Sequence, residues 1–129
     1  MTMTKPQENL LDSRARREST AAFTGVGAAS SATLGWFDFG AKKYESNHFN
    51  EQVEVVAMTG DIATIEDGKP QLHAHVVIAR RGGAAFGGHL LELRVHPTLE
   101  IILTETPTHL RKRSLPGLPV ATIRLDESG

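Results

Sequence analysis

The sequence predicts an α/β (α+β) domain in which a single antiparallel-rich, mixed β-sheet is flanked by one or two helices. From about Thr33 to Leu125 the chain consists of short segments that are rich in β-branched residues and tend to alternate apolar and polar side chains. Glycine and proline clusters separate these segments, as expected of turns between strands. A charged segment with the spacing of a short helix precedes them.

Length and composition predict one folded domain, residues 21–129, preceded by a polar arm or short helix, residues 1–20. The chain has 129 residues, of which 40% are hydrophobic and 22% are charged, and its net charge is -1. It has no cysteine, so any metal site must use His, Asp or Glu. Because no apolar run approaches the ~18 residues of a membrane span and the N-terminus lacks the apolar centre of a secretory signal, we expect a cytoplasmic protein without membrane contact.

The N-terminal part is expected to form a helix and then a turn. Glu8–Thr20 is charged and favours helix, with a thin apolar stripe along one side. Residues 23–33 (FTGVGAASSAT) are small and glycine-rich, which predicts an irregular turn segment. Gly25-x-Gly27 lacks the third glycine of the dinucleotide-binding fingerprint, so we expect a tight turn rather than a phosphate loop.

Seven strands are expected to follow. The first, Thr33–Phe39, is apolar on both faces, which predicts that both faces are buried. The others are Gln52–Thr59, Asp61–Ile65, Gln71–Ala79, Gly88–His96, Leu99–Thr106 and Pro119–Leu125. The turns between them are expected at Asp67-Gly68 with Pro70, at Arg81-Gly82-Gly83, at Pro97 and at Pro116-Gly117. A second helix is expected near His109–Ser114.

Three of the six histidines lie within residues 71–90 (QLHAHVVIARRGGAAFGGHL). Because successive side chains of a strand alternate between faces, His73 and His75 are expected to point to the same side. If the hairpin loop covers residues 80–84, His75 lies directly opposite His89 and His73 lies on the diagonal. A register shifted by one residue would instead separate the three side chains.

This register would bring three imidazoles within reach of one metal ion. Directly opposed Cβ atoms in a sheet lie about 4.5–5.5 Å apart, and diagonal ones lie about 7–8 Å apart. Three neutral imidazoles with an open fourth position suit Zn²⁺ or another divalent metal. The alternative interpretation is that the three histidines are ordinary polar strand residues held by hydrogen bonds.

Other polar residues show no such convergence. His48, His96 and His109 are expected to face solvent. Glu54 and Glu100 lie in apolar strands, where burial with an arginine partner is the simpler explanation and a role beside the metal is the alternative. The short basic segments have no interleaved aromatic residues, so they are expected to be solvated surface. The residues alone give little support to DNA binding.

Four ordered motifs make the chain resemble a known family. They are G-D-I-A at 60–63, D-G-K-P at 67–70, H-x-H at 73–75 and G-G-H-L at 87–90. Together with the preceding GVGAASSATLGWFDFGAKKY, they make about residues 20–115 resemble the PPC ("plants and prokaryotes conserved") domain, also called PD1-like DNA-binding proteins. The resemblance implies an α/β fold with one sheet flanked by helices.

The resemblance also implies a metal site and an assembly. In prokaryotic members of the family, histidines of the H-x-H and G-G-H motifs hold a metal, typically zinc, and these are His73, His75 and His89 here. Family members assemble as homotrimers. Apolar side chains on both faces of one strand, Trp36 and Phe37, also favour an assembly that buries them. One departure is that about twenty polar residues replace the strand and longer helix that usually begin the domain.

We therefore expect a homotrimeric, metal-binding PPC-domain protein that acts as a non-enzymatic regulatory or DNA-associated assembly module. The alternative is a small zinc-dependent lyase or hydrolase acting on a small acid, because the family fold is similar to that of acetolactate decarboxylase, a zinc enzyme with three histidine ligands. A small-molecule ligand at the metal is expected in either case, and DNA is a further candidate partner.

Overall fold

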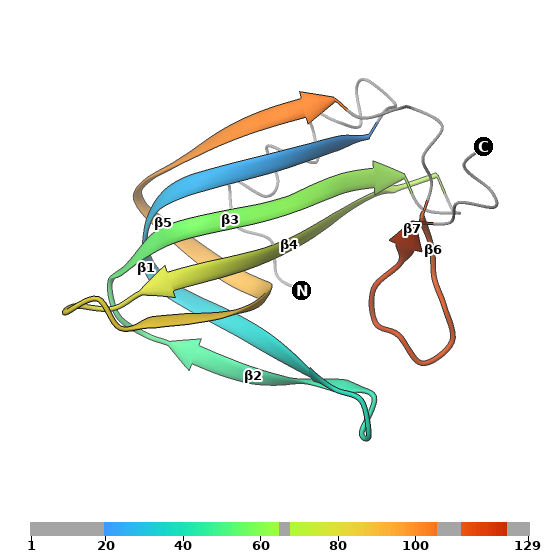
Figure 1. The fold of residues 1–129 in the computed structure, drawn as a ribbon, viewed down its shortest axis with the longest axis horizontal. Helices are drawn as coiled ribbons and strands as arrows, with labels where there is room; N and C mark the ends of the chain where they lie inside the picture. The colour runs from blue at the N-terminus through green and yellow to red at the C-terminus, as the bar shows by residue number, and fades with distance from the viewer. Residues whose placement is uncertain (1–19, 65–67, 106–111, 124–129) are drawn as a thin grey trace.

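A computed structural model describes residues 20–64, 68–105 and 112–123 of the chain, and these residues form an all-β fold (Figure 1). A five-stranded antiparallel sheet is accompanied by a small two-stranded sheet. Within the described ranges there is no helix, and so none that could cross a membrane. The predicted α/β class is therefore wrong for this part of the chain.

The five-stranded sheet has the order β2-β1-β3-β4-β5, and β5 also pairs with β1. Its strands are β1 (Ala21–Asp38), β2 (Lys43–Phe49), β3 (Val53–Thr64), β4 (Pro70–Ala79) and β5 (Ala85–Glu105). The small sheet pairs β6 (Lys112–Arg113) with β7 (Thr122–Ile123). Because β5 pairs with β4 at its start and with β1 further on, the sheet curls until its two sides meet (Figure 1).

The predicted α/β class depended on two helices. The first, Glu8–Thr20, lies outside the described residues except for Thr20, which is not helical. The second was expected near His109–Ser114, but Lys112–Arg113 forms strand β6 there. The charged composition of this segment favours helix locally, whereas pairing with β7 fixes an extended backbone.

The segment 23–33 is a strand and not the predicted turn, because it lies inside β1. Its small residues allow neighbouring strands to approach closely on both sides. A Cβ atom on Gly27 would lie 2.2 Å from the carbonyl oxygen of Thr98 on β5, so only glycine fits there. The glycines that predicted a turn thus serve close strand packing.

Two other predicted breaks also lie inside continuous strands. Gly60 lies within β3, which joins two of the predicted strands, and Pro97 lies within β5, which joins two more. The pairing of β5 with β1 shifts register around Pro97, so that a bulge accommodates the missing backbone donor. In contrast, the Gly82-Gly83 and Gly117 turns are confirmed, with φ values of 89°, 93° and 78°.

The aromatic strand near residue 36 is less buried than predicted. Trp36 is 59% exposed and Phe39 is 83% exposed, although Leu34 is buried. This part of β1 pairs with β2, a polar strand that the sequence analysis did not predict. A single copy of the chain therefore leaves aromatic surface uncovered.

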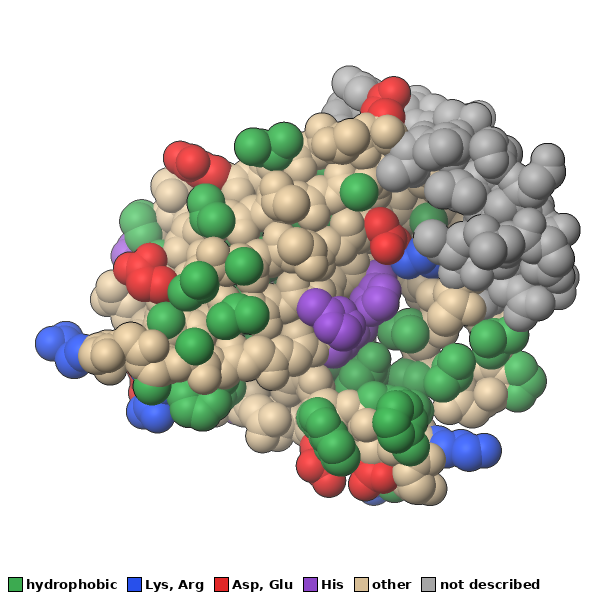
Figure 2. All heavy atoms as spheres, viewed as in Figure 1, with side chains coloured by type: hydrophobic (Ala, Val, Ile, Leu, Met, Phe, Trp, Pro, Cys, Tyr) green, Lys and Arg blue, Asp and Glu red, His purple; other side chains and the backbone are tan. Residues whose placement is uncertain are grey.

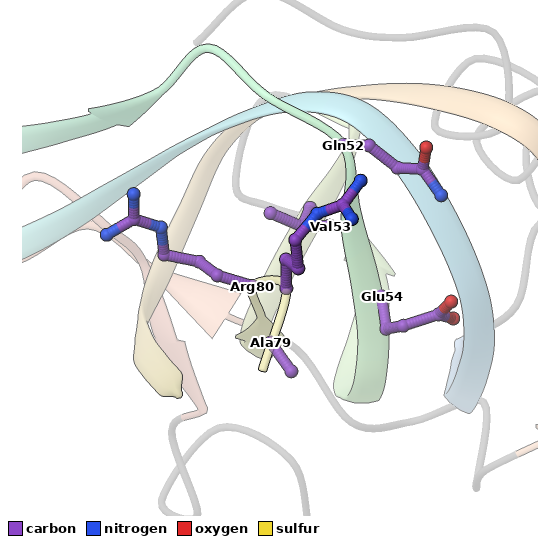
Figure 3. Close-up of a pocket in the computed structure, with 6 residues that line it drawn as sticks. Gln52, Val53, Glu54, Ala79 and Arg80 are labelled. Carbon is purple, nitrogen blue, oxygen red and sulfur yellow. The ribbon is translucent and has the colours of Figure 1, made fainter. Parts of the chain in front are cut away.

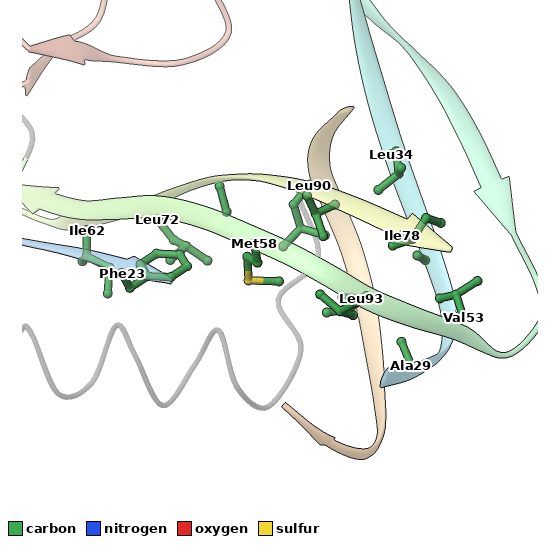
Figure 4. Close-up of a cluster of buried hydrophobic side chains, with 14 residues drawn as sticks. Phe23, Ala29, Leu34, Val53, Met58, Ile62, Leu72, Ile78, Leu90 and Leu93 are labelled. Carbon is green, nitrogen blue, oxygen red and sulfur yellow. The ribbon is translucent and has the colours of Figure 1, made fainter. Parts of the chain in front are cut away.

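The hydrophobic core lies inside the curl of the sheet (Figure 4). On β4 the side chains alternate as predicted: Leu72, Ala74, Val76 and Ile78 are buried, whereas the histidines lie on the other face. The largest fully buried side chains are Leu34, Ile62, Ile78, Leu90, Leu93, Val53 and Val55. The core thus fixes the strands whose outer faces carry the candidate site.

Candidate metal centre

The β4–β5 hairpin has the predicted register. His75 pairs directly with His89, and Ala79 pairs with Ala85. The loop closes through a hydrogen bond that the Arg80 amide donates to the Ala84 carbonyl. Two glycines with positive φ allow this turn, and they set the register that brings the two histidines together.

His73 completes a group of three. The ring centroid of His73 lies 5.1 Å from that of His75 and 5.1 Å from that of His89, and the last two centroids lie 5.5 Å apart. One potential ligand atom from each residue lies within 4.8 Å of the other two. Figure 2 shows histidine side chains gathered near the middle of one face, beside a hollow with hydrophobic side chains.

His89 lies at the point where β5 leaves β4 and joins β1. It pairs with His75 on one side and with Gly35 on the other. This crossing is tight, because a Cβ atom on Gly88 would lie 2.8 Å from the Gly35 carbonyl oxygen. His89 is consequently buried, whereas His73 is half-buried and His75 is exposed. The three-histidine group is therefore buried at His89 and open to solvent at His75.

Tyr44 on β2 supports the buried histidine. Its ring stacks on the His89 ring with a centroid distance of 4.6 Å and an interplanar angle of 23°. Gly35 makes room for it, because a Cβ atom there would lie 2.8 Å from Tyr44 Cδ1. Phe37 packs edge-on against Tyr44 at 5.4 Å. Sequence reasoning missed Tyr44 because it missed the whole of β2.

We expect Tyr44→Ala to weaken metal binding about 2- to 10-fold, the range that corresponds to the loss of one aromatic stacking contact. The stack restricts the orientation of the His89 ring, so its loss leaves that ligand less ordered. Competition with a coloured chelator measures the change. Tyr44→Phe keeps the ring and should bind like wild type; a loss as large as that of the alanine variant would contradict a stacking role.

An ion pair lies beside His73. Asp61 on β3 is directly opposite His73 in the sheet, and the Lys112 ammonium on β6 donates a hydrogen bond to its carboxylate. Lys112 is buried, at 3% exposure, whereas Asp61 is one-third exposed. Asp61 belongs to the G-D-I-A motif, so the β3–β4 register could have placed it. No local pattern marks Lys112.

His73 and His89 are held in the neutral state that binds metal. Burial, and then the neighbouring His73 and His75, lower the pKa of His89 to about 4. Burial and the Lys112 charge likewise lower the pKa of His73, while Asp61 partly offsets them. Both imidazoles are therefore neutral near pH 7.

These pKa shifts predict that the metal-free protein loses stability as the pH falls from about 6.5 towards 4. The unfolded chain takes up protons on these histidines below about 6.5, whereas the folded chain resists protonation, so acid favours unfolding. Denaturant unfolding with chelator present at pH 7.5 and 5.0 measures the effect. His89→Asn should reduce the pH dependence in this window; an unchanged dependence would contradict the lowered pKa.

The three histidines fit a metal ion by their own chemistry. Two nitrogens bound to one tetrahedral Zn²⁺ lie about 3.3 Å apart, given bond lengths near 2.0–2.1 Å. Ligand atoms already within 4.8 Å can reach this spacing by side-chain rotation. In addition, the Nδ1 atom of His89 is buried without a hydrogen-bond partner among the described residues. A bound ion would satisfy such an atom directly or fix its tautomer.

The other polar residues singled out in the sequence lie away from this group. His48 is exposed and shares a hydrogen bond with the Thr33 hydroxyl at 2.6 Å, and His96 is also exposed. His109 lies outside the described residues. Glu54 and Glu100 are exposed, so the expected burial with an arginine partner is wrong. Because both carboxylates face solvent, they avoid the desolvation cost of an unpaired buried charge.

A separate hollow lies at the far end of β4 (Figure 3). It has a volume of about 220 Å³ and is lined by Gln52, Val53, Glu54, Ala79, Arg80 and Arg81. The Arg80 guanidinium at its edge is paired with Glu51. The hollow contains none of the three histidines, so it is distinct from the candidate metal centre.

Several solved structures are similar to this fold. A candidate DNA-binding protein from Ralstonia eutropha JMP134 is 35% identical, with a TM-score of 0.80 over 92% of this chain and 82% of that chain. A plant- and prokaryote-conserved protein from Pyrococcus horikoshii is 24% identical, with a TM-score of 0.79 over 89% and 81%. A metal-containing protein from Archaeoglobus fulgidus is 20% identical, with a TM-score of 0.76 over 91% and 83%.

Sequence comparison gives the family directly. No curated protein matches the chain. The Plants and Prokaryotes Conserved (PCC) domain matches residues 9–107, which include all three histidines and most of the described sheet. The predicted resemblance is thus confirmed, and the chain belongs to the Plants and Prokaryotes Conserved domain family.

Proposed function

We propose that this chain is a Zn²⁺-binding PPC domain in which His73, His75 and His89 hold the ion and leave one coordination position open. The observation that carries the proposal is the convergence of three ligand atoms within 4.8 Å, with one ring buried and another exposed. Three imidazoles without a thiolate are typical of zinc sites that keep a position for water or a ligand. The metal-containing relative from Archaeoglobus fulgidus has the same fold and supports this assignment.

Elemental analysis of untagged protein, purified without chelator and without added metal, tests the proposal. We expect about one zinc per chain, and dialysis against a chelator should remove it. A His-tag would bind metal itself and is therefore omitted. Protein that takes up no divalent metal even when Zn²⁺ is supplied would refute the site, whereas another metal in its place would refute only the choice of zinc.

We further propose that copies of the chain assemble into a homotrimer through the face that carries His73 and His75. Four large apolar side chains on this face are exposed by 39–71%: Val26, Val56, Val77 and Ile102. They belong to four adjacent strands, so they form one apolar surface. Such a surface on a small soluble domain is typical of an interface, and threefold assembly is what the family resemblance implies.

We expect Val77→Lys to shift the assembly towards monomer, because a charge would be buried in the apolar interface. Light scattering at micromolar concentration measures the mass of wild type and variant. Lys is also substituted at Asn50, an exposed residue in the loop between β2 and β3, as a control for added charge. A wild-type protein that is monomeric at this concentration would contradict the assembly.

The role of the assembly is proposed to be non-enzymatic and DNA-associated, supported by the name of the Ralstonia eutropha relative at 35% identity. A mobility shift on duplex DNA that weakens with salt would support it. The open coordination position favours a second candidate, a zinc-dependent lyase or hydrolase acting on a small acid. Turnover of small carboxylic acids that is lost on chelation, without a DNA shift, would decide for the enzyme.

A further inference from the structure

We propose that Lys112, balanced by Asp61, makes the histidine centre a binding site for a small molecule that carries an oxyanion group, either a carboxylate or a phosphate. This inference rests on the proposed metal site and adds the chemical class of its ligand. It assigns a recognition role to the described C-terminal segment 112–123, which contributes none of the three histidines.

The first support is the burial of a lysine at this position. Lys112 is only 3% exposed, and Asp61 accepts a hydrogen bond from its ammonium. An ammonium carries three N–H donors. One carboxylate that is itself one-third exposed compensates only part of the cost of burying this charge. A lysine that served only to attach β6 to the sheet could remain at the surface, where the same pair would cost less to form.

The second support is the position of this ion pair relative to the histidines. Asp61 lies directly opposite His73 in the β3–β4 register, where neighbouring side chains on one face are about 4.5–5.5 Å apart. The Lys112 ammonium donates a hydrogen bond to this carboxylate, which places its charge beside His73. The ammonium and the open side of the metal centre therefore lie within the reach of one small ligand.

Charge balance indicates the sign of that ligand. Three neutral imidazoles leave a divalent ion with its full charge, and Asp61 can neutralise only Lys112. Counting only the residues that the structure describes, the combined site is therefore cationic in surroundings that are partly buried. An oxyanion supplies both the missing charge and several acceptor oxygens, so that it can contact the metal and the ammonium together.

Two hairpins limit the size of the ligand. The β1–β2 hairpin reaches the centre through Tyr44, which stacks on His89. The loop between β6 and β7 approaches the β1–β2 turn, because a Cβ atom on Gly117 would lie 3.3 Å from Lys42 Cδ. Figure 2 shows the histidines beside a hollow and not on a flat surface. This arrangement suits a small molecule better than a polymer.

Protein loaded with Co²⁺ provides the test, because Co²⁺ binds the same nitrogen ligands as Zn²⁺ and its visible absorption responds to a ligand at the open position. Acetate, benzoate and inorganic phosphate are titrated separately into wild type, Lys112→Met, Lys112→Arg, Asp61→Asn and Arg81→Met. The last variant loses the same charge at an exposed position near the hairpin tip. Metal content and circular dichroism are measured on each protein.

We expect Lys112→Met to weaken anion binding about 10-fold or more, the loss that corresponds to one charge-assisted hydrogen bond. Lys112→Arg and Arg81→Met should stay close to wild type. Asp61→Asn should strengthen anion binding several-fold, because it releases Lys112 from its competing carboxylate. The direction of the change in anion affinity is informative, because Lys112→Met and Asp61→Asn break the same ion pair but are expected to change the affinity in opposite directions. A purely structural pair would make the two variants fail in the same direction.

The outcomes separate this inference from the metal site on which it rests. If wild type binds no metal, both proposals fall. If wild type holds one metal but none of the three anions changes its spectrum, or if Lys112→Met binds them as wild type does, only the anion site is refuted. Should Lys112→Met not fold, Asp61→Asn decides alone: tighter binding supports the site, and equal or weaker binding overturns it. The acetate and phosphate titrations identify which oxyanion is preferred.

Discussion

His75→Ala and His89→Ala are each expected to abolish metal binding at stoichiometric concentrations. Each removes one of three protein ligands, and even the loss of a residue that only orients a ligand typically costs 10- to 100-fold in metal affinity, so a direct ligand should cost more. The sheet should survive both changes. His75 is exposed, and the buried side chains of β4 all lie on its opposite face.

The two variants differ in what else they disturb. His89→Ala also leaves a space beneath the Tyr44 ring, so we expect it to destabilise the metal-free protein by about 1–2 kcal/mol, whereas His75→Ala should have little effect. His96→Ala, at an exposed position outside the group, is the matched control. Elemental analysis and thermal unfolding measure both properties. If His89→Ala kept a full equivalent of metal, the three-histidine site would be wrong, and these residues would be ordinary polar strand positions.

The candidate site could be predicted from the sequence because its geometry depends on local rules. Side-chain alternation placed His73 and His75 on one face, and a five-residue loop with two glycines set the register that brought His89 opposite His75. These rules involve only the hairpin itself. The two supporting residues, Tyr44 and Lys112, come from distant segments, so no pattern within the hairpin could indicate them.

The strand boundaries were predicted less well because glycine and proline have two structural meanings. They punctuate turns, but they also occur inside strands where backbones approach closely or where a bulge interrupts pairing. Gly27, Gly60 and Pro97 all belong to the second kind. Because they were interpreted as breaks, the prediction divided β3 and β5 into two strands each and assigned the first half of β1 to a turn segment. The close approaches that explain them arise from pairing partners far along the chain.

Gly60→Ala is expected to be among the most damaging single substitutions in the sheet. A Cβ atom at this position would lie 2.1 Å from the His73 carbonyl oxygen, 2.8 Å from Ala74 Cα and 2.9 Å from Phe23 Cζ. The first two atoms belong to the backbone, so no side-chain rotation can relieve the clash. We expect a loss of about 3 kcal/mol or more in the free energy of unfolding, at the upper end of what overpacking costs.

The same substitution should also weaken the metal centre, because β3 can relieve the clash only by moving away from β4 at His73. Gly87→Ala is the matched control: its Cβ would meet the nearest atom, the Val76 carbonyl oxygen, at 3.4 Å, so it should be neutral or slightly stabilising. Denaturant unfolding of the metal-free proteins and metal titration of both variants test this pair. Equal stability of the two variants would mean that β3 and β4 are not in close contact at Gly60. A destabilised Gly60→Ala protein with unchanged metal affinity would mean that the position of His73 does not depend on that contact.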